Sequence, residues 1–216
     1  MTISMKLIDV YTRLKQLNLP VIQTNDAAAY LDISVNHANK LLSRISKTNQ
    51  IIHIKQGAWA FPDIDALALP GFLTSPFPSY VSLQTALYFH NMISQIPNII
   101  YAVSVGRTKV YKTPIATVSI HHIHPSFYFG YKEKGVDGLL KIASPEKALL
   151  DIFYLSQTKT RLFKTLPEVE LPKNFKIAVA NRMIAKITSV RKRTLVQRCF
   201  SEFIDSIKVN RKYDDE

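Results

Sequence analysis

Hydrophobic residues between positions 35 and 47 recur three and four positions apart along the chain. This spacing predicts a helix with one buried stripe. The stripe consists of Ala38, Leu41, Leu42 and Ile45. Ser34 precedes the helix and can cap it, because a serine hydroxyl accepts the free N–H groups of a first helical turn.

A shorter helix is predicted just before it, over 25–31. Thr24 can cap that helix, and three consecutive alanines, 27–29, favour helix and allow a second helix to approach closely. Asp32 and Ile33 form the turn between the two helices. The segment therefore predicts a helix-turn-helix.

The face of the second helix opposite its stripe is polar and contains no carboxylate. It carries Asn36, His37, Lys40, Ser43, Arg44 and Lys47. Amide, hydroxyl and cationic groups of this kind can donate to DNA phosphates and to base edges in the major groove. The alternative is a solvated helix face, because a helix pair followed by a hairpin occurs in many small domains.

A β-hairpin is expected directly after this helix. Strand-prone residues fill 51–55 and 58–61, with Gln56 and Gly57 between them. A hairpin in this place is a wing, and Lys55 and Gln56 at its tip are candidate DNA contacts. The predicted unit is a winged helix-turn-helix.

The remaining sequence predicts a first helix over 6–17 and then a second module. The first helix ends before Pro20 and would brace the helix pair. We expect three parts: a DNA-binding domain over 1–72, a proline-rich linker over 73–78, and an α+β domain over 79–216 with a helical C-terminal part.

In the second domain, short strand-like runs alternate with turns. Strands are predicted over 99–105, 110–113, 116–121, 128–132 and 139–142, which suggests a small, mostly antiparallel sheet. Helices are predicted over 83–93, capped by Ser82, and over 145–155, where Ser144 caps and Pro145 suits the first position. The fold class is therefore α+β.

The charge of the chain favours a polyanionic partner. The 216 residues carry a formal net charge of +12 at pH 7, which points to nucleic acid before an acidic protein or an anionic membrane. Residues 173–200 contain eight cations and no acid. A candidate second basic surface within this region consists of Arg182, Lys186, Arg191, Lys192 and Arg193. It could be a solvated face, a path for DNA phosphates or a docking surface for an acidic partner.

The sequence offers little to support catalysis or metal binding, and we expect no enzyme, cofactor or metal. His121 and His122 fall on opposite faces of a strand, so the histidines do not form a full zinc set. A single cysteine, Cys199, excludes a cysteine zinc cluster, and phosphate-binding glycine loops are missing. We expect Lys147 to be solvated and Asp151 to bond a neighbouring turn.

The sequence lacks the apolar core of a signal peptide, and no apolar run reaches the length of about 18 residues that spans a bilayer. The expectation is a cytoplasmic protein that does not enter a membrane.

Several segments of the second domain, in this order, resemble the AbiEi family of antitoxins and transcriptional regulators from bacterial type IV toxin–antitoxin systems. The similar segments are 80–87 (YVSLQTAL), 107–109 (RTK), Thr113-Pro114, 121–125 (HHIHP), 127–131 (FYFGY) and 142–151 (IASPEKALLD). The resemblance covers roughly residues 5–160, and the ASPEKALLD segment is its most specific part.

The resemblance implies a protein with two roles. The winged helix would bind inverted repeats in double-stranded promoter DNA and repress its own operon, and the other module would counteract a nucleotidyltransferase toxin, with or without a stable complex. Palindromic sites require two copies, as a homodimer or through cooperative binding. The main rival is a protein-interaction module whose winged helix does not bind DNA.

Overall fold

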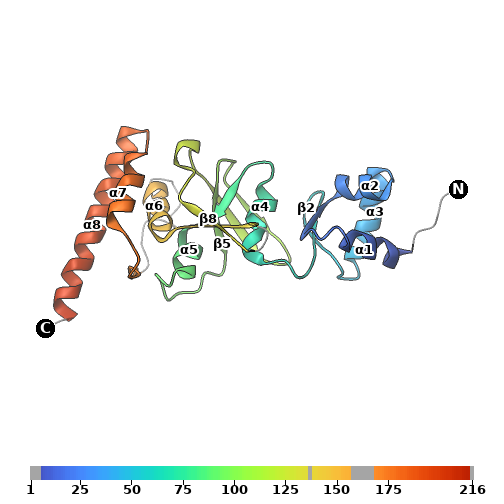
Figure 1. Ribbon diagram of the computed structural model, residues 1–216, viewed down its shortest axis with the longest axis horizontal. Helices are drawn as coiled ribbons and strands as arrows, with labels where there is room; N and C mark the ends of the chain where they lie inside the picture. Colours follow the sequence, from blue (N-terminus) through green and yellow to red (C-terminus); the bar gives the residue numbers. More distant parts are fainter. Residues whose placement is uncertain (1–5, 136–137, 157–167, 215–216) are drawn as a thin grey trace.

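The computed structural model describes residues 6–135, 138–156 and 168–214. The protein has the expected α+β composition. Figure 1 shows an elongated molecule with an N-terminal module at one end, a larger sheet in the middle and two C-terminal helices at the other end. Residues 1–5 of the predicted first domain, and residues 136–137, 157–167 and 215–216 of the second, lie outside the described residues.

The N-terminal module combines three helices with a three-stranded antiparallel sheet. Its elements are α1 (Leu7–Lys15), β1 (Val21–Gln23), α2 (Thr24–Leu31), α3 (Val35–Ser46), β2 (Ile52–Lys55) and β3 (Ala58–Ala60). The strand order is β1-β3-β2. The predicted stripe of α3 is buried against Val10 and Leu14 of α1 and Trp59 of β3, so the helical spacing correctly identified this core.

The structure corrects the prediction at the start of α2. Thr24 is the first residue of the helix, Gln23 holds the cap position, and no side chain caps the helix. The Thr24 hydroxyl instead accepts a hydrogen bond from the indole N–H of Trp59 at 3.0 Å. Strand β1, which the sequence did not predict, precedes α2 and pairs with β3.

The connection between the modules is a packed element. After a short 3₁₀ turn (η1, Ala66–Ala68) comes helix α4 (Leu69–Thr74), so the predicted linker over 73–78 begins inside a helix. Leu69 and Leu73 of α4 share a core with Ile54 and Ala60 of the first sheet and with Ile120 of the second. Because one apolar cluster includes both sheets, burial of hydrophobic surface couples the two modules.

The second sheet is mostly antiparallel, as predicted, with three antiparallel and two parallel strand pairings. Its strands are β4 (Ser79–Val81), β5 (Ile100–Ser104), β6 (Lys109–Lys112), β7 (Thr117–His122), β8 (Tyr131–Lys134) and β9 (Leu140–Ala143). Their order is β6-β7-β5-β4-β9-β8, in which β4 runs parallel to β9 and β5 parallel to β7. Strand β4, which was not predicted, lies between β5 and β9 and forms one of the two parallel pairings. Strand β8 begins later than expected because a 3₁₀ turn (η2, Pro125–Phe127) precedes it.

Opposite faces of the second sheet pack against different elements. Tyr101 and Val103 belong to the cluster formed with α5 (Leu83–Phe89) and α6 (Pro145–Leu155), whereas Ala102 between them belongs to the cluster around α4. This follows from the alternation of side chains along a strand. Helices α7 (Ile177–Ala185) and α8 (Val190–Asp214) pack outside α6. Within the described residues, no helix combines the length and hydrophobicity that a membrane crossing requires.

Candidate nucleic-acid interface

Helix α3 is held by a cap and a tight turn. The Ser34 hydroxyl accepts the backbone N–H of His37 at 3.3 Å, as the sequence predicted. Asp32 ends α2 in the left-handed conformation with φ +55°, which short polar side chains tolerate better than most. The backbone N–H of Ile33 then donates to the carbonyl of Ala28 at 3.0 Å. These contacts fix the direction in which α3 leaves α2.

The polar face of α3 is presented to solvent. Asn36, His37, Lys40, Arg44 and Lys47 are exposed, and Ser43 is half-buried. The stripe residues on the other side are at most 6% exposed. Because α3 and its cap residues contain no acid, the exposed face offers hydrogen-bond donors and positive charge with no carboxylate of its own to repel phosphate.

The hairpin after α3 is a tight one. Strands β2 and β3 are joined by Gln56 and Gly57, and Gly57 has φ +75°, a conformation that glycine adopts without steric cost. The Gly57 carbonyl accepts the backbone N–H of Thr24 at 2.8 Å and the Thr24 hydroxyl at 3.3 Å. The hairpin tip is therefore fastened to the first turn of α2.

A groove of about 480 Å³ lies between α3 and this hairpin. It is lined by Asn39, Ser43, Ser46, Lys47, His53, Gln56, Gly57 and Trp59. The polar lining groups are amides, hydroxyls, an imidazole and an ammonium. Such groups bind sugar-phosphate backbone through hydrogen bonds and charge.

Three residues of this groove were missed by sequence reasoning: Asn39, Ser46 and His53. Asn39 and Ser46 are seven positions apart and flank Ser43, so helical spacing alone places them on one side of α3. The His53 ring contacts the Trp59 ring in a tilted arrangement, with ring centroids 4.6 Å apart. Nothing in the sequence specified that contact, which depends on the hairpin register.

The two predicted hairpin contacts have different surroundings. Gln56 is exposed at the tip. The ammonium of Lys55 donates to the carbonyls of Leu73 at 3.1 Å and Ser75 at 3.4 Å, and so joins the hairpin to the end of α4. Burial lowers the pKa of Lys55, and the neighbouring charge of Lys109 lowers it further. Lys55 is thus already engaged within the chain.

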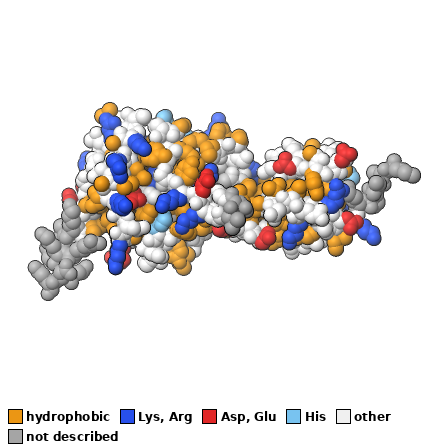
Figure 2. Space-filling model, in the orientation of Figure 1, with side chains coloured by type: hydrophobic (Ala, Val, Ile, Leu, Met, Phe, Trp, Pro, Cys, Tyr) orange, Lys and Arg blue, Asp and Glu red, His pale blue; other side chains and the backbone are white. Residues whose placement is uncertain are grey.

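The residues of the predicted second basic surface lie on α7, at its C-cap and on α8, in different surroundings. Figure 2 shows Lys and Arg side chains spread over the C-terminal end of the visible face. Arg182 is exposed on α7, and the Lys186 ammonium lies 4.9 Å from the ring centroid of Phe129. The Arg193 guanidinium donates to the Ile187 carbonyl at 3.3 Å. Arg191 and Lys192 line a separate groove together with Arg198.

Two neighbouring histidines of the second domain, His121 and His122, have different environments. His121 is buried and bonds Ser119 through Nε2 at 3.0 Å, whereas His122 is exposed and bonds the Gly106 carbonyl through Nδ1 at 2.9 Å. Burial lowers the pKa of His121 to about 4, so it is neutral near pH 7. No set of three potential metal ligands comes together in the part of the chain that the structure describes.

The largest departure from the sequence-based expectation is the environment of Lys147. It was expected to be solvated, yet its side chain is fully buried and forms an ion pair with the equally buried Asp151, one helical turn further along α6. The Lys147 ammonium lies 3.4 Å from the ring centroid of Phe127. Asp151 was expected to hydrogen-bond to a neighbouring turn, but its carboxylate accepts hydrogen bonds from other side chains instead.

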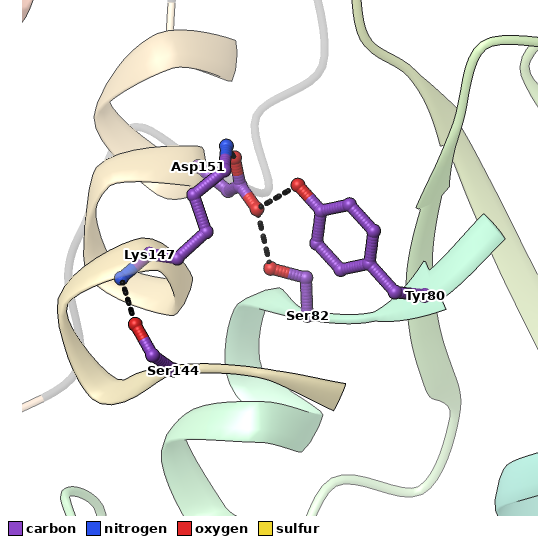
Figure 3. A network of polar contacts seen from close by, with 5 residues as sticks. All are labelled: Tyr80, Ser82, Ser144, Lys147 and Asp151. Atoms are coloured by element: carbon purple, nitrogen blue, oxygen red, sulfur yellow. Dashed lines mark hydrogen bonds and ion pairs between the residues drawn. The ribbon is translucent and has the colours of Figure 1, made fainter. Parts of the chain in front are cut away.

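Asp151 joins α6 to the central strand β4. Its carboxylate accepts the Tyr80 hydroxyl at 3.0 Å and the Ser82 hydroxyl at 2.7 Å, and Figure 3 shows these groups converging between the two elements. The Ser82 hydroxyl therefore does not cap α5 as predicted. Burial lowers the pKa of Lys147 to about 8, against the opposing effect of the Asp151 charge, and burial raises the pKa of Asp151. The two hydroxyl donors stabilise the carboxylate form.

Two further contacts hold the start of α6 in place. Ser144 caps α6 by accepting the Lys147 backbone N–H at 3.2 Å, and the buried Glu146 accepts the backbone N–H of Lys176 at 3.0 Å. The charged residues of the ASPEKALLD segment thus face the protein interior and hold α6 to its neighbours. They form an internal anchor and not an open site.

Comparison with known proteins adds little to this geometry. No protein-family model matches the sequence, and no curated protein matches it. Among solved structures, the antibiotic-resistance factor ANT(2'')-Ia aligns with 68% of this chain and 94% of its own, at 10% identity and a TM-score of 0.31. A similarity this low supports no inference about fold or activity.

Proposed function

We propose that the N-terminal module is a winged helix-turn-helix that binds double-stranded DNA with α3 in the major groove. The observation that carries the proposal is the exposed face of α3, which presents Asn36, Lys40 and Arg44 opposite its buried stripe and contains no acid. An α-helix fits the major groove of B-DNA, where amide and guanidinium groups can distinguish base pairs.

The hairpin supports the same proposal from a second direction. The groove between α3 and the hairpin would receive one sugar-phosphate strand, contacted by Ser46, Lys47 and Gln56. Contacts of this kind set the register of a protein on DNA, whereas contacts from α3 to base edges supply sequence preference. Because Thr24 fastens the hairpin tip to α2, the two contact surfaces are held in a fixed relation.

We further propose that this DNA binding represses transcription of the protein's own operon, and that the protein is the antitoxin of a type IV toxin–antitoxin system. The support for this step is the sequence resemblance to AbiEi proteins over roughly residues 5–160. The cognate partner would be a nucleotidyltransferase toxin. Two copies would occupy an inverted repeat, one on each half-site.

The rival is a module in which the same helix and hairpin contact a protein. Both hypotheses use the exposed face of α3, but only DNA binding releases counterions from a polyanion and so weakens steeply with salt. The dependence of binding on salt and on DNA sequence therefore distinguishes them.

The test is a fluorescence anisotropy titration of the intact protein with the duplex upstream of its gene and with a scrambled duplex of equal length and composition. We expect the upstream duplex to bind at least about 1,000-fold more tightly near 150 mM salt. Raising salt from 50 to 200 mM should weaken binding by about 100-fold if four phosphates are contacted. Equal affinity for both duplexes would refute sequence-specific repression, and absence of binding at 50 mM salt would refute DNA binding altogether.

A further inference from the structure

Arg191, Lys192 and Arg198 line a second groove, which we call the basic groove. It is a cavity of about 820 Å³ at the far end of the molecule from α3. It lies where the end of β7, the last turn of α6 and the first turns of α8 meet. Its volume is within the range of about 300–1,000 Å³ that is typical of small-molecule sites. The proposed DNA interface shares no residue with it.

Three cations line the basic groove. Arg191 and Arg198 are exposed at its edge, and the half-buried Lys192 lies with its ammonium 3.8 Å from the ring centroid of Tyr154. Burial lowers the pKa of Lys192. Arg198 also contacts Glu202 at 3.8 Å, but both side chains are largely exposed. Exposed pairs of this kind contribute little, so Arg198 can exchange Glu202 for an anionic ligand.

Neutral donors reinforce the positive charge. The backbone N–H of Ser126 donates to Nδ1 of His124, so the neutral ring carries its proton on Nε2 and can donate from there. The hydroxyls of Thr188, Ser189 and Thr194 also line the groove. No carboxylate lines it among the described residues.

The lining of the same groove also contains apolar residues. Ile187 is buried, Leu195 is half-buried, and the Tyr154 ring lies under the Lys192 ammonium. The groove lining therefore combines cations and hydrogen-bond donors with apolar groups. A ligand complementary to both kinds of group carries several negative charges and a less polar body.

From this arrangement we propose that the basic groove binds a nucleoside polyphosphate. Arg191 and Arg198 take the phosphates, because a guanidinium can bond two phosphate oxygens at once. The nucleoside lies towards Ile187 and Leu195. This assignment does not rest on the proposed DNA binding, which uses the opposite end of the chain.

The test is isothermal titration of the full chain at 150 mM salt with ATP, with inorganic pyrophosphate and with adenosine. We expect ATP to bind with a dissociation constant below about 1 mM, pyrophosphate to bind more weakly and adenosine not to bind. The double variant Arg191→Ala/Arg198→Ala should weaken ATP binding at least about tenfold. Its matched control is Lys173→Ala/Arg182→Ala, which removes two exposed charges outside the groove and should bind ATP like the wild type.

Three results would overturn the assignment. The first is no heat with 1 mM ATP for a wild-type protein that circular dichroism shows to be folded. The second is an equal loss of affinity in the double variant and in its matched control, which would indicate general charge attraction. The third is an Arg191- and Arg198-dependent interaction with a DNA duplex alone, which would assign the groove to nucleic-acid backbone.

Discussion

Asp151→Ala is expected to lower the free energy of unfolding by about 3–5 kcal/mol. The substitution removes the partner of the fully buried Lys147 and leaves its ammonium without a carboxylate in the core. It also removes the acceptor of the Tyr80 and Ser82 hydroxyls, by which α6 is bonded to β4. Denaturant unfolding followed by circular dichroism measures the effect.

The matched control for Asp151 is an exposed ion pair in the same domain. Glu133 on β8 contacts Lys141 on β9 at 3.1 Å; Glu133 is exposed and Lys141 is half-buried. Glu133→Ala should change stability by less than about 1 kcal/mol. A double variant, Lys147→Met/Asp151→Leu, should recover part of the loss because it removes both charges together. A loss below about 1 kcal/mol for Asp151→Ala would contradict the anchoring role of the pair.

Lys40→Ala combined with Arg44→Ala is expected to weaken binding to the upstream duplex at least about 50-fold. Each residue contributes a cation from the exposed face of α3, and a good contact from such a side chain to a base is worth about 1–3 kcal/mol. Both side chains are exposed on α3, so the protein should stay folded. Anisotropy titration at several salt concentrations also gives the slope of affinity against salt, which should fall by about one for each lost phosphate contact.

Lys6→Ala combined with Lys15→Ala is the matched control for charge. Lys6 is the N-cap residue of α1 and Lys15 is its last residue, and both are exposed in the same module as α3. The double variant therefore removes two cations and leaves α3 unchanged. The control should bind within about threefold of the wild type. Equal losses in the two double variants would mean that net charge, and not the α3 face, determines binding.

The sequence predicted those elements whose formation depends on local spacing. The stripe of α3, its Ser34 cap, the tight Gln56-Gly57 hairpin and the α6 cap at Ser144 all follow from nearby residues. The two short strands β1 and β4 were missed because three residues carry too little periodicity to distinguish a strand from a loop. Because β4 was missed, its parallel pairing with β9 was missed as well.

Long-range contacts account for the other errors. Thr24 has the sequence context of a cap, but its hydroxyl is committed to Trp59, 35 positions away. Lys147 follows Pro145 and Glu146 in what reads as an exposed first turn, yet Phe127 and Tyr80 enclose it. A lysine is seldom buried without a partner, and only the fold shows that Asp151 and a shell of aromatic rings surround this one.

The most direct test of the proposed DNA interface is site-specific photo-crosslinking. A photoreactive benzoylphenylalanine is placed either at Asn36, exposed on α3, or at Lys15, exposed on α1, and the intact protein is irradiated with the labelled upstream duplex at saturating concentration. Efficient crosslinking from position 36, with little or none from position 15, is the predicted result. Crosslinking from position 15 alone, or from neither position while the duplex is bound, would show that α3 does not contact the DNA.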